Sequence, residues 1–304
     1  MKEIHIHLYG SIPLYYLKSI SENDIDYENL EKTLSKVINK ELDYHKAFDA
    51  FIYVNNIVNT DMKIENGTKE LMKELIKDNV TYVELRTGLK KLDGTLETYL
   101  QSVIRGVHLG TENSNLKAYL ILSLRRDTKK NIADETIDLA IKYKDYIIGI
   151  DISGDSLQGN GSDIFESILR AKSNGFPVTL HIGETPKETL EQQMVELLTI
   201  KPERVGHAVH LHDDSRKFIL ENKICIEMCL SSALYAGMVS DMKDHPALQL
   251  LLDNYPVAIC TDDPLIFNTT LSKEYDICSR ITGLGIDEIK DKMNKIESYI
   301  FKKD

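Results

Sequence analysis

Eight short runs rich in β-branched and other apolar residues recur along this chain, and they limit its possible folds more than any other feature. The runs are EIHIHLY (3–9), TYVELR (81–86), KAYLILSL (117–124), IIGIDIS (147–153), PVTLHIG (177–183), RVGHA (204–208), KICIEMC (223–229) and PVAICTDD (256–263). Between most of them apolar residues repeat every three or four positions, as amphipathic helices require. Strands that alternate with helices over roughly 250 residues predict an α/β fold, a (β/α)8 TIM barrel. An open doubly wound sheet is the alternative, but no G-x-G-x-x-G follows a strand.

The first connection between strands, residues 11–79, is unusually long. It contains helical patterns near 27–39, 44–58 and 64–78. On a barrel such a segment would lie over the mouth at the strand C-termini, so we expect a helical lid inserted after the first strand. Neither an internal repeat nor a linker-like segment interrupts the sequence, which predicts one barrel domain over residues 1–304.

Charge and cysteine content restrict the class of protein. The 304-residue chain has a formal net charge of -11, which argues against a nucleic-acid or membrane-surface binder because such proteins need basic surface. No apolar run reaches the length of a membrane span and no secretory leader is evident, so we expect a cytoplasmic enzyme. Cys225, Cys229, Cys260 and Cys278 fit reduced thiols there, the first two as core residues.

Polar residues gather where the predicted strands end. His5 and His7 share one face of the first strand because side chains at i and i+2 point the same way. The other strand-end residues are His181, Glu184, His207, Asp262 and Asp263. Each alone fits a buried histidine, a surface acid or a turn, but strand ends of one barrel surround one mouth. Three histidines and a carboxylate there predict a mononuclear metal site.

The order H-x-H, H-x-x-E, H, D-D closely resembles the adenosine deaminase family of amidohydrolase barrels. HIHLYGS, GIDISGD, HIGE, RVGHA and CTDDP look like its successive motifs, and the resemblance extends over essentially the whole chain. VELR, LRRDT, LSS at 230–232 and LSKEY at 271–275 look most like the branch that deaminates N6-substituted purine nucleoside monophosphates. IIGIDIS contains no lysine that could bridge two metals, which favours one metal per chain.

The resemblance implies a ligand set and a division of chemical roles. One Zn²⁺ would be held by His5, His7, His181 and Asp262 and would activate a water molecule. Glu184 would be the general acid that protonates the purine ring, and His207 would orient the water and help deprotonate it. Asp262 would also accept a hydrogen bond from that water.

The substrate contacts are expected around the same mouth. By resemblance, Asp263 would bond the five-membered part of the purine, the Gly154 backbone NH would meet a ring nitrogen, and His7 would belong to this pocket as well. Tyr9 departs from the pattern, since the family has aspartate there and this branch has asparagine on the ribose side. A tyrosine carries no charge near pH 7, so it would not repel a phosphate, which favours a monophosphate substrate.

A basic segment after the second strand offers donors for such a phosphate. Arg86, Thr87, Lys90 and Lys91 could meet a 5′-phosphate through charge-assisted bonds, or they could form a solvated loop. The loop RTGLKK also lacks a proline that this branch usually carries. Ser11 is a further candidate for a phosphate or ribose contact.

The expected function is therefore metal-dependent deamination of adenine nucleoside 5′-monophosphates (N6-methyl-AMP or AMP to IMP) or of adenosine to inosine. A small purine nucleoside or nucleotide would be the partner, with no nucleic acid or membrane, and the protein would be a monomer. Another amidohydrolase acting on adenine base or a cyclic amide is the alternative enzyme. A catalytically silent nucleotide-binding barrel is the alternative from a different class, but it would not need Glu184 as an acid. His108, His210, His212 and His245 are given no catalytic role, and His45 is a weak pocket candidate.

Overall fold

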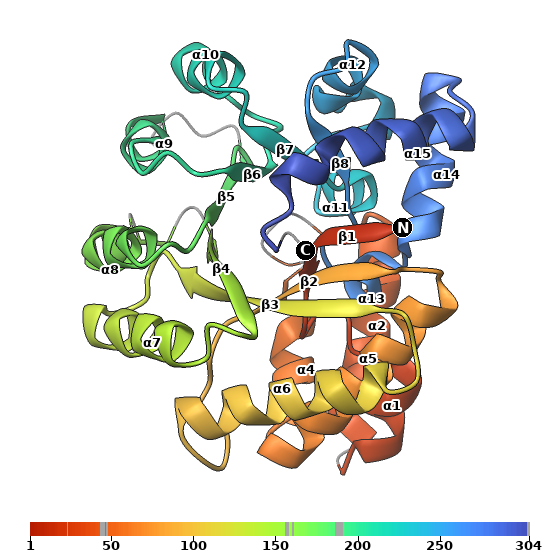
Figure 1. Ribbon diagram of the computed structural model, residues 1–304. Coiled ribbons are helices and arrows are strands. Elements are labelled where there is room, and N and C mark those ends of the chain that lie inside the picture. The colour runs from red at the N-terminus through yellow and green to blue at the C-terminus, as the bar shows by residue number, and fades with distance from the viewer. Residues whose placement is uncertain are drawn as a thin grey trace.

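Eight parallel strands form the centre of the molecule (Figure 1). The computed structural model describes residues 1–304 except 23, 43–45, 47, 156–157, 160, 186–190 and 303–304, and only the backbone of 191–193. The strands are β1 (Lys2–His7), β2 (Tyr82–Thr87), β3 (Lys117–Arg125), β4 (Ile147–Ser153), β5 (Val178–Ile182), β6 (Arg204–His207), β7 (Cys225–Met228) and β8 (Val257–Ile259). Each pairs with the next along the chain. All eight predicted strands are confirmed.

The residues after β8 close the ring. The backbone NH of Asp262 donates to the His5 carbonyl at 2.9 Å, and the NH of His7 donates to the Asp262 carbonyl at 2.9 Å. Ile6 and Asp262 form a parallel bridge outside the named strands. The (β/α)8 TIM barrel is therefore confirmed, and its seam lies beside the residues predicted to bind metal.

Helices surround the strands in the order that a barrel requires (Figure 1). They are α1 (Leu14–Ile20), α2 (Asp24–Ile38), α4 (Ala50–Ile57), α5 (Asp61–Lys77), α6 (Leu96–Thr111), α7 (Lys130–Lys142), α8 (Ser162–Ser173), α9 (Glu191–Leu198), α10 (Asp213–Glu221), α11 (Leu230–Tyr235), α12 (Ala247–Leu252), α13 (Pro264–Phe267), α14 (Leu271–Thr282) and α15 (Ile286–Lys295). Short 3-10 turns occupy Met242–Asp244 and Ile296–Tyr299. None of the helices in the described part of the chain has the length and apolar character needed to cross a bilayer.

The long connection after β1 has two parts. Its last helix, α5, packs along α6 and belongs to the outer ring of the barrel (Figure 1). Gly106 of α6 allows this approach, since a Cβ there would lie 2.4 Å from the Glu65 carbonyl oxygen. The region that could cover the mouth is therefore shorter than 11–79. It comprises α1, α2 and α4, and α2 packs against α13, which begins immediately after Asp263.

The barrel interior is charged as well as apolar. Apolar residues of all eight strands are buried, as parallel sheets covered on both faces require. The same strands also carry fully buried ionisable side chains. These are Glu3, His5, Glu84, Arg86, Asp151, Arg204 and Glu227. Because an isolated buried charge is very costly, such groups need partners inside the barrel. Most of them pair with one another, whereas Glu3 accepts hydrogen bonds from Thr261 and the His5 backbone NH.

Candidate metal-dependent active site

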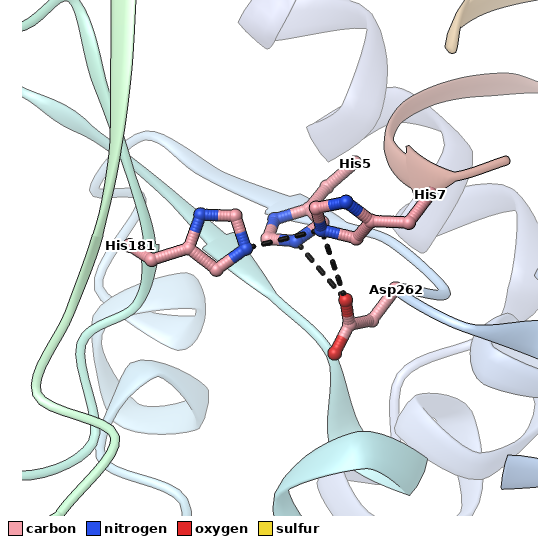
Figure 2. A group of neighbouring side chains, drawn as sticks. All are labelled: His5, His7, His181 and Asp262. Carbon is pink, nitrogen blue, oxygen red and sulfur yellow. Dashed lines mark hydrogen bonds and ion pairs between the residues drawn. The ribbon is translucent and has the colours of Figure 1, made fainter. Parts of the chain in front are cut away.

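Three histidines and one aspartate meet at the C-terminal ends of β1 and β5 and at the residues after β8 (Figure 2). The Nε2 atoms of His7 and His181 lie 3.1 Å apart. Asp262 Oδ1 lies 3.3 Å from His5 Nε2 and 3.4 Å from His7 Nε2. The four ligand atoms all lie within 4.8 Å of one another. Within the described ranges this is the one such group of potential metal ligands.

Two buried carboxylates orient the imidazole rings. Glu227 Oε2 lies 2.8 Å from His5 Nδ1, and Asp151 Oδ1 lies 2.9 Å from His181 Nδ1. An ionised carboxylate only accepts hydrogen bonds, so each Nδ1 carries the ring proton and each Nε2 presents a lone pair to the centre of the cluster. Burial lowers the pKa of His7 to about 3, so that its ring is neutral. This donor set fits a divalent metal ion such as zinc.

The two oxygens of Asp262 have different contacts. Ser232, in α11, donates from its hydroxyl to Oδ2 at 2.6 Å, which leaves Oδ1 facing the histidines. Asp262 also has a left-handed backbone, with φ of 66°. Non-glycine residues rarely adopt this conformation, and it often marks functional sites.

His207 and Glu184 face the cluster. His207 Nε2 lies 3.9 Å from Glu184 Oε1 and 4.0 Å from Asp262 Oδ2. Burial holds the pKa of His207 well below its ordinary value, so its ring is neutral and one ring nitrogen keeps its lone pair. A carboxyl group and a neutral imidazole therefore lie on the same side of the metal cluster, which is the arrangement that general acid and base chemistry needs.

The backbone around His207 is shaped by close packing. His207 and Ala208 both have positive φ values, 64° and 56°. A Cβ at Gly206 would lie only 2.8 Å from His5 Cε1, so glycine is needed for the imidazole to reach its place. In RVGHA, Gly206 therefore leaves room for the His5 ring, and the positive φ of His207 accompanies the placement of its side chain in the site.

Arg126 is a site residue that the sequence did not reveal. Its guanidinium donates to the Gly154 carbonyl at 3.1 Å and to the His181 carbonyl, and its Nη1 lies 3.9 Å from Glu184 Oε2. It is buried. The LRRDT stretch contributed only to the family resemblance, and nothing in it separates the buried Arg126 from Arg125, whose side chain is largely exposed.

The predicted purine contacts lie next to the cluster. Asp263 is buried, and a Cβ at Gly10 would lie 1.7 Å from Asp263 Oδ1, so only glycine leaves room for this carboxyl. Burial and the adjacent Asp262 charge raise the pKa of Asp263 well above its ordinary range, which makes its carboxyl a potential donor. Gly154 follows β4 with φ of 89°.

Tyr9 and Lys90 lie together beside the mouth. Lys90 Nζ stands 3.2 Å from the centroid of the Tyr9 ring and also donates to Asn55 of α4. The Tyr9 ring is buried. The basic loop after β2 is therefore joined to the helices inserted after β1, and the Lys90 ammonium is held between the Tyr9 ring and α4.

Ser11 and Thr87 are already hydrogen-bonded within the protein. Ser11 donates from its hydroxyl to the His7 carbonyl at 2.6 Å, and the Thr87 and Tyr99 hydroxyls lie 2.7 Å apart. Both residues are buried. They support the ends of β1 and β2.

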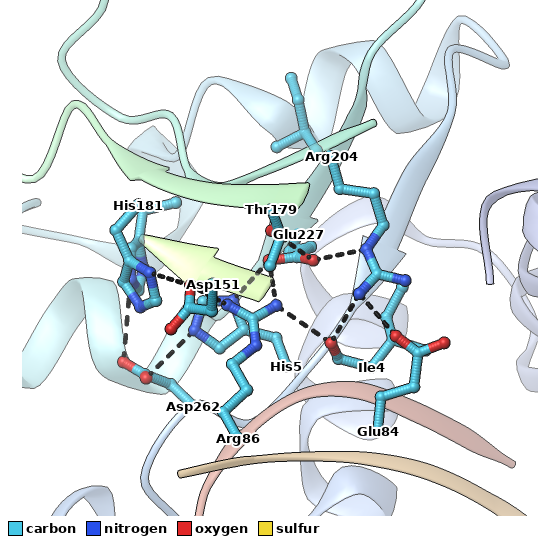
Figure 3. A network of polar contacts seen from close by, with 12 residues as sticks. Ile4, His5, Glu84, Arg86, Asp151, Thr179, His181, Arg204, Glu227 and Asp262 are labelled. Carbon is cyan, nitrogen blue, oxygen red and sulfur yellow. Dashed lines mark hydrogen bonds and ion pairs between the residues drawn. The ribbon is translucent and has the colours of Figure 1, made fainter. Parts of the chain in front are cut away.

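Arg86 does not lie where the sequence predicts it. It belongs to β2 and is fully buried, with its guanidinium directed into the barrel (Figure 3). It donates to Glu227 and Asp151, at 2.6 and 3.2 Å. The prediction that Arg86 meets a phosphate is wrong, because its guanidinium is fully buried and paired with two carboxylates inside the barrel. In the sequence, the inward face of the strand and the following loop could not be told apart at this position.

The remaining histidines lie outside the cluster where they are described. His108 is exposed on α6, and His245 is buried next to α12. His210 Nε2 lies 2.9 Å from the Met238 carbonyl oxygen. His45 lies outside the described residues.

A parallel barrel with a three-histidine, one-carboxylate cluster at its mouth, faced by an acid and a fourth histidine, defines the class of metal-dependent hydrolases built on the (β/α)8 fold. The family model described as adenosine deaminase matches residues 1–303, and the chain belongs to that family. The family prediction made from the strand-end motifs is confirmed.

Curated relatives place the chain within this family. It is 28% identical to N6-methyl-AMP deaminase of Homo sapiens, over 99% of this chain and 88% of the relative. It is also 28% identical to N6-mAMP deaminase of Arabidopsis thaliana, over 94% of this chain and 88% of the relative. The crystal structure of the Arabidopsis N6-mAMP deaminase has a TM-score of 0.91 and 28% identity, covering 100% of this chain and 93% of that one. An Arabidopsis structure complexed with IMP has a TM-score of 0.91 and 27% identity, covering 100% of this chain and 92% of that one.

Proposed function

We propose that this protein hydrolytically deaminates the 6-position of a purine nucleoside 5′-monophosphate, with N6-methyl-AMP and AMP as the leading substrates and IMP as the product. The observation that carries the proposal is the placement of Glu184 and His207 against the cluster of His5, His7, His181 and Asp262. The names of the curated relatives support the substrate class, since several are N6-methyl-AMP deaminases.

The metal is proposed to be one Zn²⁺ per chain, held by the four residues of the cluster. When bound, zinc lowers the pKa of water towards neutrality and so supplies a nucleophile at physiological pH. The choice of zinc rests on the three imidazole nitrogens and single carboxylate, a borderline-soft donor set, whereas magnesium and calcium prefer oxygen ligands.

The residues around the metal divide the proton transfers between them. His207 is neutral and buried, so it can take a proton from the attacking water. Glu184 lies on the same side of the site, and its role is to give a proton to the ring nitrogen beside the attacked carbon. Protonation prevents negative charge from accumulating on the purine. The proton taken up by His207 then passes to the departing amino group, which leaves as ammonia or methylamine, and the proton of the added hydroxyl returns to Glu184 as the 6-oxo group forms.

Purine orientation is assigned to Asp263 and Gly154. A protonated Asp263 carboxyl donates to a nitrogen of the five-membered ring. Arg126 donates to the Gly154 carbonyl at 3.1 Å and so restrains the backbone just after β4, where the glycine NH is assigned to the six-membered ring. The two contacts from opposite sides would place the 6-position over the metal.

The 5′-phosphate is assigned to Lys90. Its ammonium is fixed between the Tyr9 ring and α4, and Tyr9 brings no negative charge to this side of the pocket. Arg86 is paired with carboxylates inside the barrel, whereas Lys90 is fixed by its contacts with Tyr9 and Asn55. A phosphate would receive a charge-assisted bond there, whereas adenosine would gain nothing from it.

The test is a side-by-side deamination assay on zinc-loaded protein with adenosine, AMP, N6-methyl-AMP and adenine, followed by ultraviolet absorbance and mass spectrometry. We expect turnover of the two monophosphates with kcat/KM at least about tenfold above adenosine, and none of adenine. Metal-free protein is the control and should be inactive. Preference for adenosine would overturn the phosphate assignment, and activity on adenine alone would favour a base deaminase.

A further inference from the structure

Arg86 lies at the centre of a buried polar network beneath the metal cluster (Figure 3). Its Nη2 donates to Glu227 Oε2 at 2.6 Å, and the same oxygen lies 2.8 Å from His5 Nδ1. The other amino group, Nη1, donates to Asp151 Oδ1 at 3.2 Å. That oxygen in turn lies 2.9 Å from His181 Nδ1. One guanidinium thus contacts both oxygens that orient metal ligands.

The geometry of these contacts depends on the shape of the arginine side chain. A guanidinium is planar and presents its N–H groups in a rigid fork, so two bonds formed at once fix the separation of their acceptors. The acceptors here come from β4 and β7, which are not neighbours in the sheet. Arg86, on β2, therefore connects β4 and β7. The carboxylates of these two strands contact His181 and His5 at Nδ1, the ring nitrogen that does not face the metal cluster. A third bond, from Nη2 to the Ile4 carbonyl at 3.0 Å, adds β1 itself.

The carboxylates also need a cation nearby. Glu227 and Asp151 are fully buried, and two buried carboxylates without a counter-charge would each be strongly destabilised. The Arg86 charge lies between the two carboxylates and opposes this.

We propose that Arg86 is a positioning residue that holds Glu227 and Asp151 in one fixed arrangement and thereby sets the metal affinity of the site. This proposal rests on the proposed metal site and assigns Arg86 no contact with metal or substrate.

The chain contains a matched control in Arg204. This arginine is also fully buried, and it donates to Glu227 from Nε, at 2.7 Å. The acceptor is Oε1, the oxygen that does not face His5, and its Nη2 binds Glu84 at 2.6 Å. Arg204 therefore belongs to the same network and carries the same charge, but it contacts neither of the two oxygens that orient a ligand.

The experiment compares the zinc dissociation constants of wild type, Arg86→Lys and Arg204→Lys by competition with a chromophoric chelator. Lysine keeps the charge but loses the fork. We expect Arg86→Lys to weaken zinc binding by about 10- to 100-fold, the usual effect of losing a residue that supports metal ligands. Arg204→Lys should stay within about threefold of wild type while losing comparable thermal stability. The visible spectrum of the cobalt(II)-loaded proteins should change for Arg86→Lys alone.

Two results would overturn the proposal: unchanged zinc affinity in Arg86→Lys, or an equal loss in Arg204→Lys, which would indicate a general effect of disturbing the core. If instead the proposed metal site were wrong, the wild-type protein itself would bind no zinc, so the two failures can be told apart.

Should Arg86→Lys fail to fold, Arg86→Gln combined with Asp151→Asn removes one buried cation and one buried anion together. Its reference is Asp151→Asn alone. The single variant keeps the bond from Arg86 to Glu227, which orients His5, and the double variant loses it. The double variant should therefore bind zinc at least about threefold more weakly than the single one. Equal affinities would contradict the proposal.

Discussion

Ser232 donates a 2.6 Å hydrogen bond to Asp262 Oδ2, and so leaves Oδ1 of the same carboxylate directed at His5 and His7. Both residues are buried. A monodentate carboxylate ligand needs such a fixed orientation, and α11 is positioned to supply it, because the Glu274 carboxylate of α14 accepts from the backbone NH groups of Leu230 and Ser231.

Ser232→Ala should therefore weaken metal binding. Removing the hydroxyl leaves Asp262 Oδ2 buried without its donor and lets the carboxylate rotate. We expect zinc affinity to fall by about tenfold and the free energy of unfolding to fall by about 1 to 3 kcal/mol. Chelator competition and chemical denaturation would measure these. Ser215→Ala, at a buried serine of α10 far from the cluster, is the matched control and should retain wild-type zinc affinity.

Glu184→Gln tests the general acid. The amide keeps the size of the side chain but cannot deliver the proton, so kcat should fall by at least about 10²- to 10⁴-fold. Metal content, measured by elemental analysis, should stay at one zinc per chain because Glu184 is not in the ligand cluster. Turnover near the wild-type rate would remove Glu184 from this role.

His7→Ala tests the ligand set. Three ligands would remain, and zinc content after dialysis against a dilute chelator should drop well below one per chain. His7 is the most exposed of the four ligands, with 20% of its side chain accessible, so its loss should disturb folding least. His108→Ala on α6 is the control. A variant that retained full zinc content would show that His7 is not a ligand.

Lys90→Met tests the phosphate contact. The KM for AMP should rise by about 10- to 100-fold, the cost of losing a hydrogen bond to a charged group. The KM for adenosine, which has no phosphate, should change little. Lys91→Met, at the exposed neighbouring residue, is the matched control. Equal effects on both substrates would mean that Lys90 acts by packing on Tyr9.

The same lysine predicts a pH dependence. Burial, aided by the nearby Arg125 charge, lowers the pKa of Lys90 to about 7. The ammonium is therefore charged below this value and loses its charge as the pH rises through it. The KM for AMP should rise between pH 7 and 9, whereas that for adenosine should stay level. Initial-rate measurements with both substrates over this range would check it, and parallel profiles would argue against a phosphate at Lys90.

The buried charges of the barrel were the hardest features to predict. Glu84 and Arg86 alternate on one face of β2, and Asp151 and Glu227 stand inside otherwise apolar runs. A charged residue in the middle of a strand that is buried on both faces must have a partner, and this signal was available in the sequence. Strand and loop residues carry the same charge at this point of the sequence, so the residue type alone fits a phosphate-binding loop as well as the barrel interior.

Local sequence determined the strands and the chemical groups at their ends. β-branched runs favour strands, and histidines two residues apart on a strand share a face, so β1 and the pair of His5 and His7 could be predicted directly. The tertiary structure alone decided which charges meet. Glu227 reaches His5 across 222 positions of the chain, and such a contact depends on barrel closure and strand register, which no local pattern encodes. The tertiary structure also decided that α5 belongs to the outer ring of the barrel. Its sequence pattern fits a barrel helix or a lid helix equally well, and only its packing against α6 distinguishes the two.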